Sequence, residues 1–217
     1  MMLVDLHIHT NRSSYCSGLS PQELIQEAMR LGLDGVAVTE HSTHRGAQIV
    51  YEMAEGHELV VFRGIEVYTD QGDMLVFGIS SRVDADMDFE KLLRVVRGEG
   101  GVIIAAHPTR GYWGHHRKYK GETSLEVLAR LDGVETHNGG CPAEKNELAL
   151  KRARELGLPS LGGSDAHMHY SVGKCLTVFE RRFRTEEELM EEIRAGRCRG
   201  AYLEEVPRQL QPEGLQG

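Results

Sequence analysis

The chain has 217 residues, of which 40% are hydrophobic and 27% charged, and its formal net charge is −8. These totals predict one globular domain over residues 1–217 with a polar C-terminal tail from about residue 205. The net negative charge argues against bulk nucleic acid or a membrane as a partner. The four cysteines are scattered and form no CxxC pair, which is typical of reduced thiols in a cytoplasmic protein.

Strands and helices alternate in chain order. Apolar runs predict strands at 3–10, 35–39, 59–67, 74–78, 101–106, 133–138 and 201–203, and the segment 159–163 leads into a further strand end at 164–167. Amphipathic spacing predicts helices at 20–32, 47–55, 88–98, 124–130, 142–156 and 185–196. This alternation favours an α/β fold with a mostly parallel sheet, either open or closed into a barrel.

The first strand carries the strongest chemical signal. With a period of two, its apolar face holds Val4, Leu6 and Ile8, and its other face holds Asp5, His7 and His9. A carboxylate and two imidazoles are costly to bury without partners, and a divalent cation would satisfy all three. The alternative is the polar face of an ordinary edge strand.

Further metal-ligand types follow other predicted strands. They are His41, Glu66, His107, Asp165 and His167. Only a closed or nearly closed ring brings so many strand ends to one point, so we expect a small, distorted barrel with its site at that end. Nitrogen and oxygen donors in this mixture suit Zn²⁺, Mn²⁺ or Fe²⁺, and their number indicates two or three ions.

Five short motifs resemble, in their order, those of the PHP (polymerase and histidinol phosphatase) family of metal-dependent phosphoesterases. They are Asp5–Thr10, Thr39–His41, Gly64–Glu66, Ala106–Pro108 and Gly163–His167, which together span about three quarters of the chain. The resemblance implies a distorted seven-stranded (β/α)7 TIM-like barrel with up to three metals at the C-terminal ends of its strands. It assigns His7, His9, Glu66 and Asp165 to one metal, Glu66 and His107 to a second, and His41 with His167 to a third.

The chain departs from the family pattern at two positions. Many relatives have a histidine where this chain has Asp73, which we include as a ligand because aspartate also binds metals. Some three-metal members have a histidine where this chain has Tyr15, so the third metal is one ligand short. The neighbouring Cys16 is expected to be incidental to the site.

The segment 109–121 is long, basic and aromatic, as binding loops often are. Arg110 directly follows the His107 strand end and is placed to clamp a phosphate, with Asn138 as a second substrate contact. The same loop offers further cations and stacking rings at Tyr112, Trp113, Arg117, Lys118 and Lys120.

The leading hypothesis is a metal-dependent phosphoesterase that hydrolyses a small phosphomonoester or short nucleotide phosphate. His7, His9, Glu66 and Asp165 would act through their bound metals, which activate a hydroxide. One alternative is an amidohydrolase-type metallohydrolase, although those enzymes often bridge their metals with a modified lysine and no lysine here ends a strand. Another is a non-catalytic metal-binding module.

Overall fold

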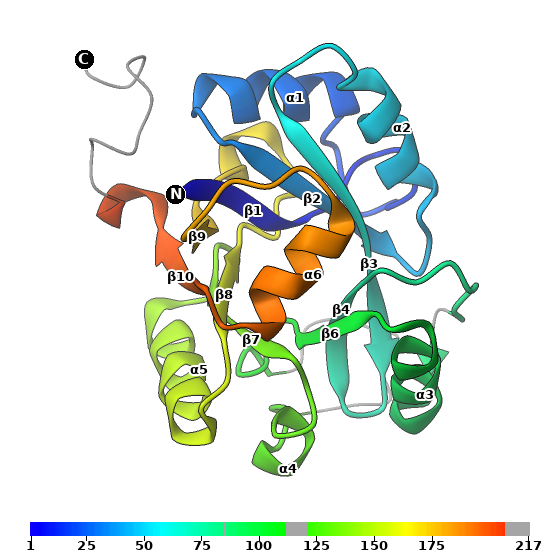
Figure 1. The fold of residues 1–217 in the computed structure, drawn as a ribbon, viewed down its shortest axis with the longest axis vertical. Coiled ribbons are helices and arrows are strands. Elements are labelled where there is room, and N and C mark those ends of the chain that lie inside the picture. Colours follow the sequence, from blue (N-terminus) through cyan, green and yellow to red (C-terminus); the bar gives the residue numbers. More distant parts are fainter. Residues whose placement is uncertain (85, 112–120, 207–217) are drawn as a thin grey trace.

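The computed structural model describes residues 1–84, 86–111 and 121–206, and these residues form an α/β fold built on one sheet (Figure 1). The sheet order is β10-β9-β1-β2-β3-β4-β6-β7-β8, with β5 paired to β3. The strands are β1 (Met2–Ile8), β2 (Gly35–His41), β3 (Val60–Thr69), β4 (Gly72–Phe77), β5 (Asp86–Met87), β6 (Val102–Ala105), β7 (Gly133–Asn138), β8 (Ser160–Gly163), β9 (Cys175–Phe179) and β10 (Cys198–Tyr202). The helices are α1 (Pro21–Arg30), α2 (Arg45–Met53), α3 (Phe89–Glu99), α4 (Leu125–Leu128), α5 (Ala143–Leu156) and α6 (Glu186–Arg194).

The sheet curls into a nearly closed ring, which confirms the predicted barrel. β1, β2 and β3 pair in parallel, as do β6, β7 and β8. β4 lies antiparallel between the two groups, so all six of those strands run in one direction. The ring closes where Ile8 bridges to Ala166, the His9 N–H donates to the Ala166 carbonyl at 3.0 Å, and the Asp165 N–H donates to the His7 carbonyl at 2.8 Å. Seven strands, β1 to β4 and β6 to β8, thus surround one interior.

Two antiparallel strands extend the sheet beyond the ring. β9 pairs with the first half of β1, from Met2 to Val4, and β10 pairs with β9. β9 and β5 were not predicted, and β10 begins three residues before its predicted start. From residue 207 onward, the predicted polar tail lies outside the described residues.

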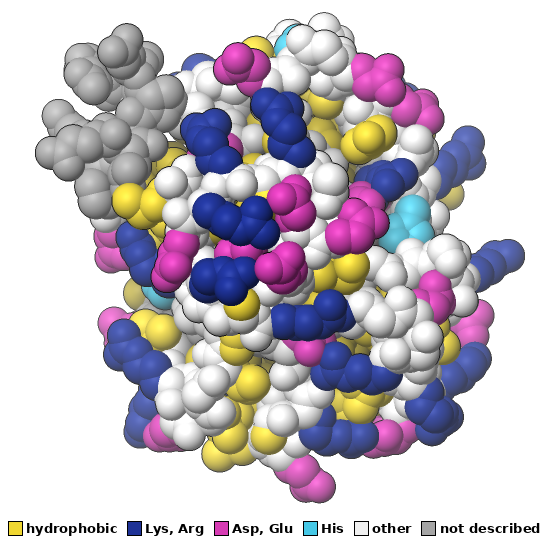
Figure 2. All heavy atoms as spheres, in the orientation of Figure 1, with side chains coloured by type: hydrophobic (Ala, Val, Ile, Leu, Met, Phe, Trp, Pro, Cys, Tyr) yellow, Lys and Arg dark blue, Asp and Glu magenta, His cyan; other side chains and the backbone are white. Residues whose placement is uncertain are grey.

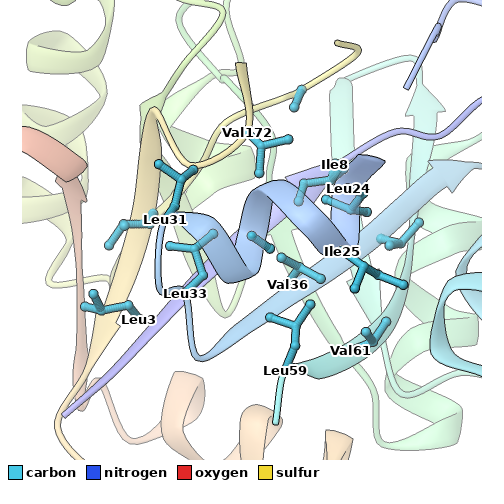
Figure 3. Packing of buried hydrophobic residues seen from close by; sticks show 14 of the residues in the cluster. Leu3, Ile8, Leu24, Ile25, Leu31, Leu33, Val36, Leu59, Val61 and Val172 are labelled. Carbon is cyan, nitrogen blue, oxygen red and sulfur yellow. The ribbon is translucent and has the colours of Figure 1, made fainter. Parts of the chain in front are cut away.

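The first helix shows how local sequence signals build the outer layer. Ser20 and Glu23 form a capping box, in which the Glu23 N–H donates to Ser20 Oγ and the Ser20 N–H donates to Glu23 Oε2. The apolar side of α1 then packs on the sheet, and Figure 3 shows Leu24 and Ile25 in one cluster with Ile8 of β1. The helix therefore covers the outer face of the first strands.

The barrel interior is a second apolar region that ends below the polar rim. It contains Leu6, Phe62 and Phe77 from the strands, together with Leu189 and Ile193 of α6. α6 thereby closes the end of the barrel where the parallel strands begin. On the face shown in Figure 2, acidic and basic side chains are interspersed over α6, and buried Glu192 accepts hydrogen bonds from Arg181 and Arg197.

The predicted two-faced pattern of the first strand is wrong in part. Leu6 faces the interior cluster, but Ile8 packs in the outer cluster under α1. The β1–β2 register shifts between Asp5 and Ile8, and this irregularity changes which side chains point inward. The side chain of His7 can therefore point into the barrel at its rim, whereas that of Asp5 contacts the backbone at Ser164 and Gly173.

None of the described helices combines the length and apolar character of a membrane span.

Candidate metal centre

The ring brings all eight predicted ligand residues to one end of the barrel. His7 lies on β1 and His9 just beyond it, and the others are His41 at the end of β2, Glu66 on β3, Asp73 on β4, His107 after β6, and Asp165 and His167 after β8. β4 runs the opposite way, so Asp73 at its start pairs with Tyr68 near the end of β3. Residues up to 160 positions apart in the chain therefore share one rim.

Glu66 occupies the middle of the cluster. Its Oε1 lies 3.0 Å from His107 Nε2 and 3.6 Å from His7 Nε2. Its Oε2 lies 3.0 Å from His41 Nδ1 and 3.4 Å from His9 Nε2. One carboxylate thus faces four imidazoles, two with each oxygen, which is the placement of a carboxylate that bridges two ions.

Asp165 approaches the same group from the opposite side of the ring. Its Oδ1 lies 3.5 Å from Nε2 of both His7 and His9 and 3.7 Å from His167 Nδ1. Its backbone φ is +53° and that of His107 is +30°, a region that residues other than glycine rarely adopt. Both residues follow strand ends, and such strain is typical of functional positions.

The side chains present fit divalent metal ions. Four groups of three residues have ligand atoms within 4.8 Å of one another, namely His9–His41–His167, His7–His9–Glu66, His7–His107–Asp165 and Glu66–Asp73–His107. The Nε2 atoms of His7 and His9 are 3.0 Å apart on fully buried rings. The Nδ1 atom of His41 is also buried, and it faces Glu66 Oε2. Converging lone pairs of this kind are the arrangement that a cation satisfies.

The electrostatics favour charged carboxylates beside a neutral imidazole. Burial disfavours the charged form of Glu66, but hydrogen bonds from His107, His41 and His7 hold its pKa well below its ordinary value. Burial lowers the pKa of His9 to about 4, despite its contact with Asp165. His9 therefore keeps a free lone pair at neutral pH, whereas the carboxylates of Glu135 and Asp165 outweigh burial and raise the pKa of His7, so that a cation would have to displace a proton there.

A buried carboxylate outside the predicted set contacts two of the candidate ligand residues. Glu135 Oε1 lies 3.0 Å from His7 Nδ1, and its Oε2 accepts the backbone N–H of His107 at 2.7 Å. Asn138 Nδ2 donates to the same Oε2 at 3.0 Å. Contact through Nδ1 turns His7 Nε2 toward the cluster. The available signal was a glutamate near the middle of the predicted strand 133–138.

A similar arrangement supports His9. Its Nδ1 lies 3.3 Å from Ser14 Oγ, and the Ser14 hydroxyl donates to buried Glu40. The Thr10 hydroxyl also donates to Glu40. No sequence pattern had indicated this role for Glu40.

Asp5 does not share an ion with His7 and His9, contrary to the expectation from the first strand. Its carboxylate accepts the backbone N–H groups of Ser164 at 2.8 Å and Gly173 at 2.9 Å. Asp5 is therefore an anchor for the segment that carries Asp165.

Arg110 and Asn138, the two predicted substrate contacts, lie together beside the cluster. The Arg110 Nη2 group donates to Asn138 Oδ1 at 2.6 Å and to Asp165 Oδ2. Its Nε donates to Cys141 Sγ at 3.3 Å. Only 15% of the Arg110 side chain is exposed, so this cation is held close to the carboxylates. Tyr112, Trp113, Arg117, Lys118 and Lys120 lie outside the described residues.

The remaining histidines have other surroundings. His137 packs edge-on against Tyr202, and His169 against Tyr170. His57 is exposed, and His115 and His116 lie outside the described residues. Cys16, by contrast, lies next to the cluster, with its Sγ 3.3 Å from His41 Nε2.

The chain resembles known proteins in sequence. A family model for a PHP-associated region, PHP_C, matches residues 143–198. An uncharacterised protein of Methanocaldococcus jannaschii is 27% identical over 146 residues, which cover 63% of this chain and 82% of that protein. The error-prone DNA polymerase of Pseudomonas aeruginosa is 25% identical over 204 residues, covering 84% of this chain but only 19% of the polymerase.

Solved structures share the fold. PsfC from Pseudomonas syringae has a TM-score of 0.70 at 20% identity, covering 95% of this chain and 93% of its own. A candidate metal-dependent phosphoesterase from Bifidobacterium adolescentis has a TM-score of 0.57 at 21% identity, covering 76% and 87%. An amidohydrolase from Chromobacterium violaceum, solved with bound sulfate and no metal, has a TM-score of 0.63 at 15% identity, covering 92% and 98%.

The family model matches the C-terminal part of the chain, whereas the five motifs end at His167, so the two signals are largely complementary. The similarity to a DNA polymerase agrees with the family's name, and the barrel agrees with the architecture that the motifs imply. Together, the family model and the polymerase relatives support a protein of the PHP family.

Proposed function

We propose that this protein is a metal-dependent phosphoesterase that hydrolyses a small phosphomonoester or a short nucleotide phosphate. The observation that carries the proposal is Arg110, a largely buried guanidinium that touches Asp165 within a cluster of potential metal ligands. A fixed cation beside a metal centre is suited to a substrate that brings several negative oxygens to one place. Phosphate does so, and its geometry matches the planar donors of arginine.

The proposed centre holds two or three divalent ions, of Zn²⁺, Mn²⁺ or Fe²⁺. His7, His9, Glu66 and Asp165 would hold one, Glu66 and His107 with Asp73 a second, and His41 with His167 a third. Such ions polarise a phosphoryl oxygen and lower the pKa of a water molecule toward neutrality.

The chain's own groups bind and orient the substrate. Arg110 and Asn138 would contact the phosphate from the β6 and β7 side of the rim. Arg110 now donates to Asp165, so in the complex the guanidinium would share its donors between that carboxylate and the phosphate. Glu135 would keep His7 in position throughout the cycle.

The substrate is proposed to be small. The net charge of −8 opposes attraction of a long polyanion, whereas one phosphate requires only local cations. The four free cysteines agree with action in the reducing cytoplasm.

A phosphate-release screen on metal-replete protein tests the proposal. The panel includes an aryl phosphate, nucleotides, sugar phosphates and histidinol phosphate. We expect His7→Ala and Asp165→Ala to abolish the metal-stimulated release, and exposed His57→Ala to keep it as the matched control. Arg110→Lys keeps the charge but loses the planar fork, so kcat/KM falls by roughly 10- to 100-fold, the equivalent of one hydrogen bond to a charged group. Full turnover in His7→Ala or Asp165→Ala would refute the assignment.

Amide hydrolysis is the second candidate, because an amidohydrolase shares the fold. No described lysine belongs to the ligand groups; Lys145 pairs with Glu122 and Lys174 lies over the Tyr170 ring. Turnover of cyclic amides without phosphate release would favour this candidate. Metal binding without turnover of either substrate class would indicate the non-catalytic module.

A further inference from the structure

We propose that Cys16 is a metal ligand, and that its thiolate completes a site with His41 and His167 at the outer side of the centre. The inference rests on the proposed metal-dependent function and extends it to one ion position. That position was one ligand short by sequence, because Tyr15 stands where some relatives have a histidine. Tyr15 is fully exposed and points to solvent, so it does not fill the gap.

The distance between Cys16 and His41 suits a shared ion. Cys16 Sγ lies 3.3 Å from His41 Nε2, and Cys16 is also close enough to His167 to help raise the pKa of that imidazole. In a tetrahedral zinc site with Zn–N near 2.0 Å and Zn–S near 2.3 Å, two ligand atoms are about 3.5 Å apart. The nitrogen and sulfur are therefore already spaced as ligands of one ion would be.

His41 connects this position to the rest of the centre. Its Nδ1 faces Glu66 Oε2 at 3.0 Å, and its Nε2 faces both Cys16 and the hydroxyl of Tyr68, at 3.0 Å from the latter. The two nitrogens thus point to different sides. An ion bound on the Cys16 side would replace the Tyr68 hydroxyl as the partner of His41 Nε2.

Cys16 is not an isolated thiol. His9, His41 and His167 form one of the groups whose ligand atoms lie within 4.8 Å of one another. The rings of His41 and His167 are both packed against His9, with centroids 4.4 and 4.6 Å away. The thiol therefore adjoins a cluster of imidazoles whose convergence does not depend on Cys16.

The loop that carries Cys16 is held at both ends. On one side the Ser14 hydroxyl donates to Glu40. On the other side the Ser17 hydroxyl donates to the carbonyls of His9 at 2.9 Å and His167 at 3.1 Å. These bonds fix the thiol beside His167 before any ion arrives, which lowers the conformational cost of binding.

The donor set indicates which ion this position prefers. Two imidazoles and a thiolate, with one position open to substrate or water, match the pattern of catalytic zinc sites. Sulfur donors select zinc over Mn²⁺ and Mg²⁺. The inner positions, which have only nitrogen and oxygen donors, lack that preference.

Cobalt spectroscopy tests the ligand directly. Metal-free wild-type protein, Cys16→Ser and Cys198→Ser are each titrated with Co²⁺ alone. Cys198, on β10 at the opposite side of the core, is the matched control. We expect a near-ultraviolet sulfur-to-cobalt charge-transfer band in wild type and Cys198→Ser, and none in Cys16→Ser. The affinity of Cys16→Ser for the ion at this position should fall by more than about 10-fold, because the loss of a residue that only supports a ligand already weakens metal binding by that factor. Equal bands in all three proteins, or none in wild type, would overturn the proposal.

A measurement on unaltered protein provides the second test. Iodoacetamide labelling followed by peptide mapping gives the alkylation rate of exposed Cys16 with and without Zn²⁺. Protection by Zn²⁺ is expected, and equal rates would contradict the assignment. A cobalt–sulfur band without phosphate release on any substrate would keep this inference and reject the proposed function. Phosphate release without the band would reject this inference alone.

Discussion

At the scale of single residues, the candidate centre includes a buried carboxylate outside the predicted ligand set. Glu135 contacts the side chain of His7, the backbone of His107 and the side chain of Asn138. It therefore couples β1, the loop after β6 and β7 through one carboxylate. Ligand histidines generally need such a partner to fix the ring and its tautomer.

We predict that Glu135→Gln lowers the affinity of the tightest metal ion by roughly 10- to 100-fold. The amide can still accept the His107 N–H, so the fold is retained, but it no longer offers a charged acceptor to His7 Nδ1. Competition with a chromophoric chelator measures the affinity, and exposed Glu155→Gln on α5 serves as the control. Unchanged affinity in Glu135→Gln would mean that His7 needs no such support.

Most of the candidate ligand positions were predictable because they stand at the ends of recognisable apolar runs, as His107 follows 101–106. The partners of the ligands were not. The local sequence around a glutamate inside a strand, such as Glu135, is the same whether its side chain faces solvent or a histidine 128 positions away. The faces of β1 were misassigned because period-two alternation assumes an unbroken ladder, and the register shifts between Asp5 and Ile8.

At the scale of elements, closure of the barrel requires residues without side chains. A Cβ on Gly163, at the end of β8, would lie 2.4 Å from His7 Cβ and 2.7 Å from His7 N. Both of those atoms belong to the relatively rigid β1. β8 can therefore approach β1 only because position 163 is glycine.

We predict that Gly163→Ala lowers the free energy of unfolding by about 1–3 kcal/mol, the usual cost of overpacking, and also weakens metal binding through His7. Gly98→Ala is the opposite control. A Cβ at Gly98, in α3, meets nothing within 4 Å, so alanine there should raise stability by about 0.5–1 kcal/mol. Urea denaturation of metal-free protein measures both changes. A neutral Gly163→Ala would mean that the strands can move apart.

The elements themselves were mostly predictable from periodicity and caps, and 133–138 matches β7 at both ends. β9 was missed although Cys175–Phe179 is apolar enough to be a strand. It follows a loop and pairs antiparallel with β1, so the alternation of strand and helix, which identified the others, is interrupted there.

At the scale of the whole molecule, the barrel concentrates acidic groups at one end. Glu66, Asp73 and Asp165 converge there, with Glu135 and Glu40 buried directly behind them. The net charge of the chain is also negative. Cations that bind only the folded state should therefore add to its stability.

We predict that Zn²⁺ at 100 times its dissociation constant raises the free energy of unfolding by about 2.7 kcal/mol. For a domain of this size the midpoint of thermal unfolding should then rise by roughly 5–11 °C. Thermal denaturation with and without a chelator measures the shift. Asp165→Ala should show a much smaller shift, and an equal shift in both proteins would place the ion elsewhere.

The closed barrel was predictable because ligands at the ends of five strands require a ring. How the ring closes was not, since the Ile8–Ala166 bridge and the α6 cap are contacts between distant segments. Contacts of this kind leave no signal in the local sequence.

That closure has a consequence for protein synthesis. Asp5 and Ser164 meet across 159 positions, so the first motif leaves the ribosome long before its counterpart is made. At about 5–20 residues per second the delay is roughly 8–30 seconds. Throughout this interval the nascent histidine pair lacks Asp165, so we expect any binding of ions at this centre to wait until most of the polypeptide has been translated.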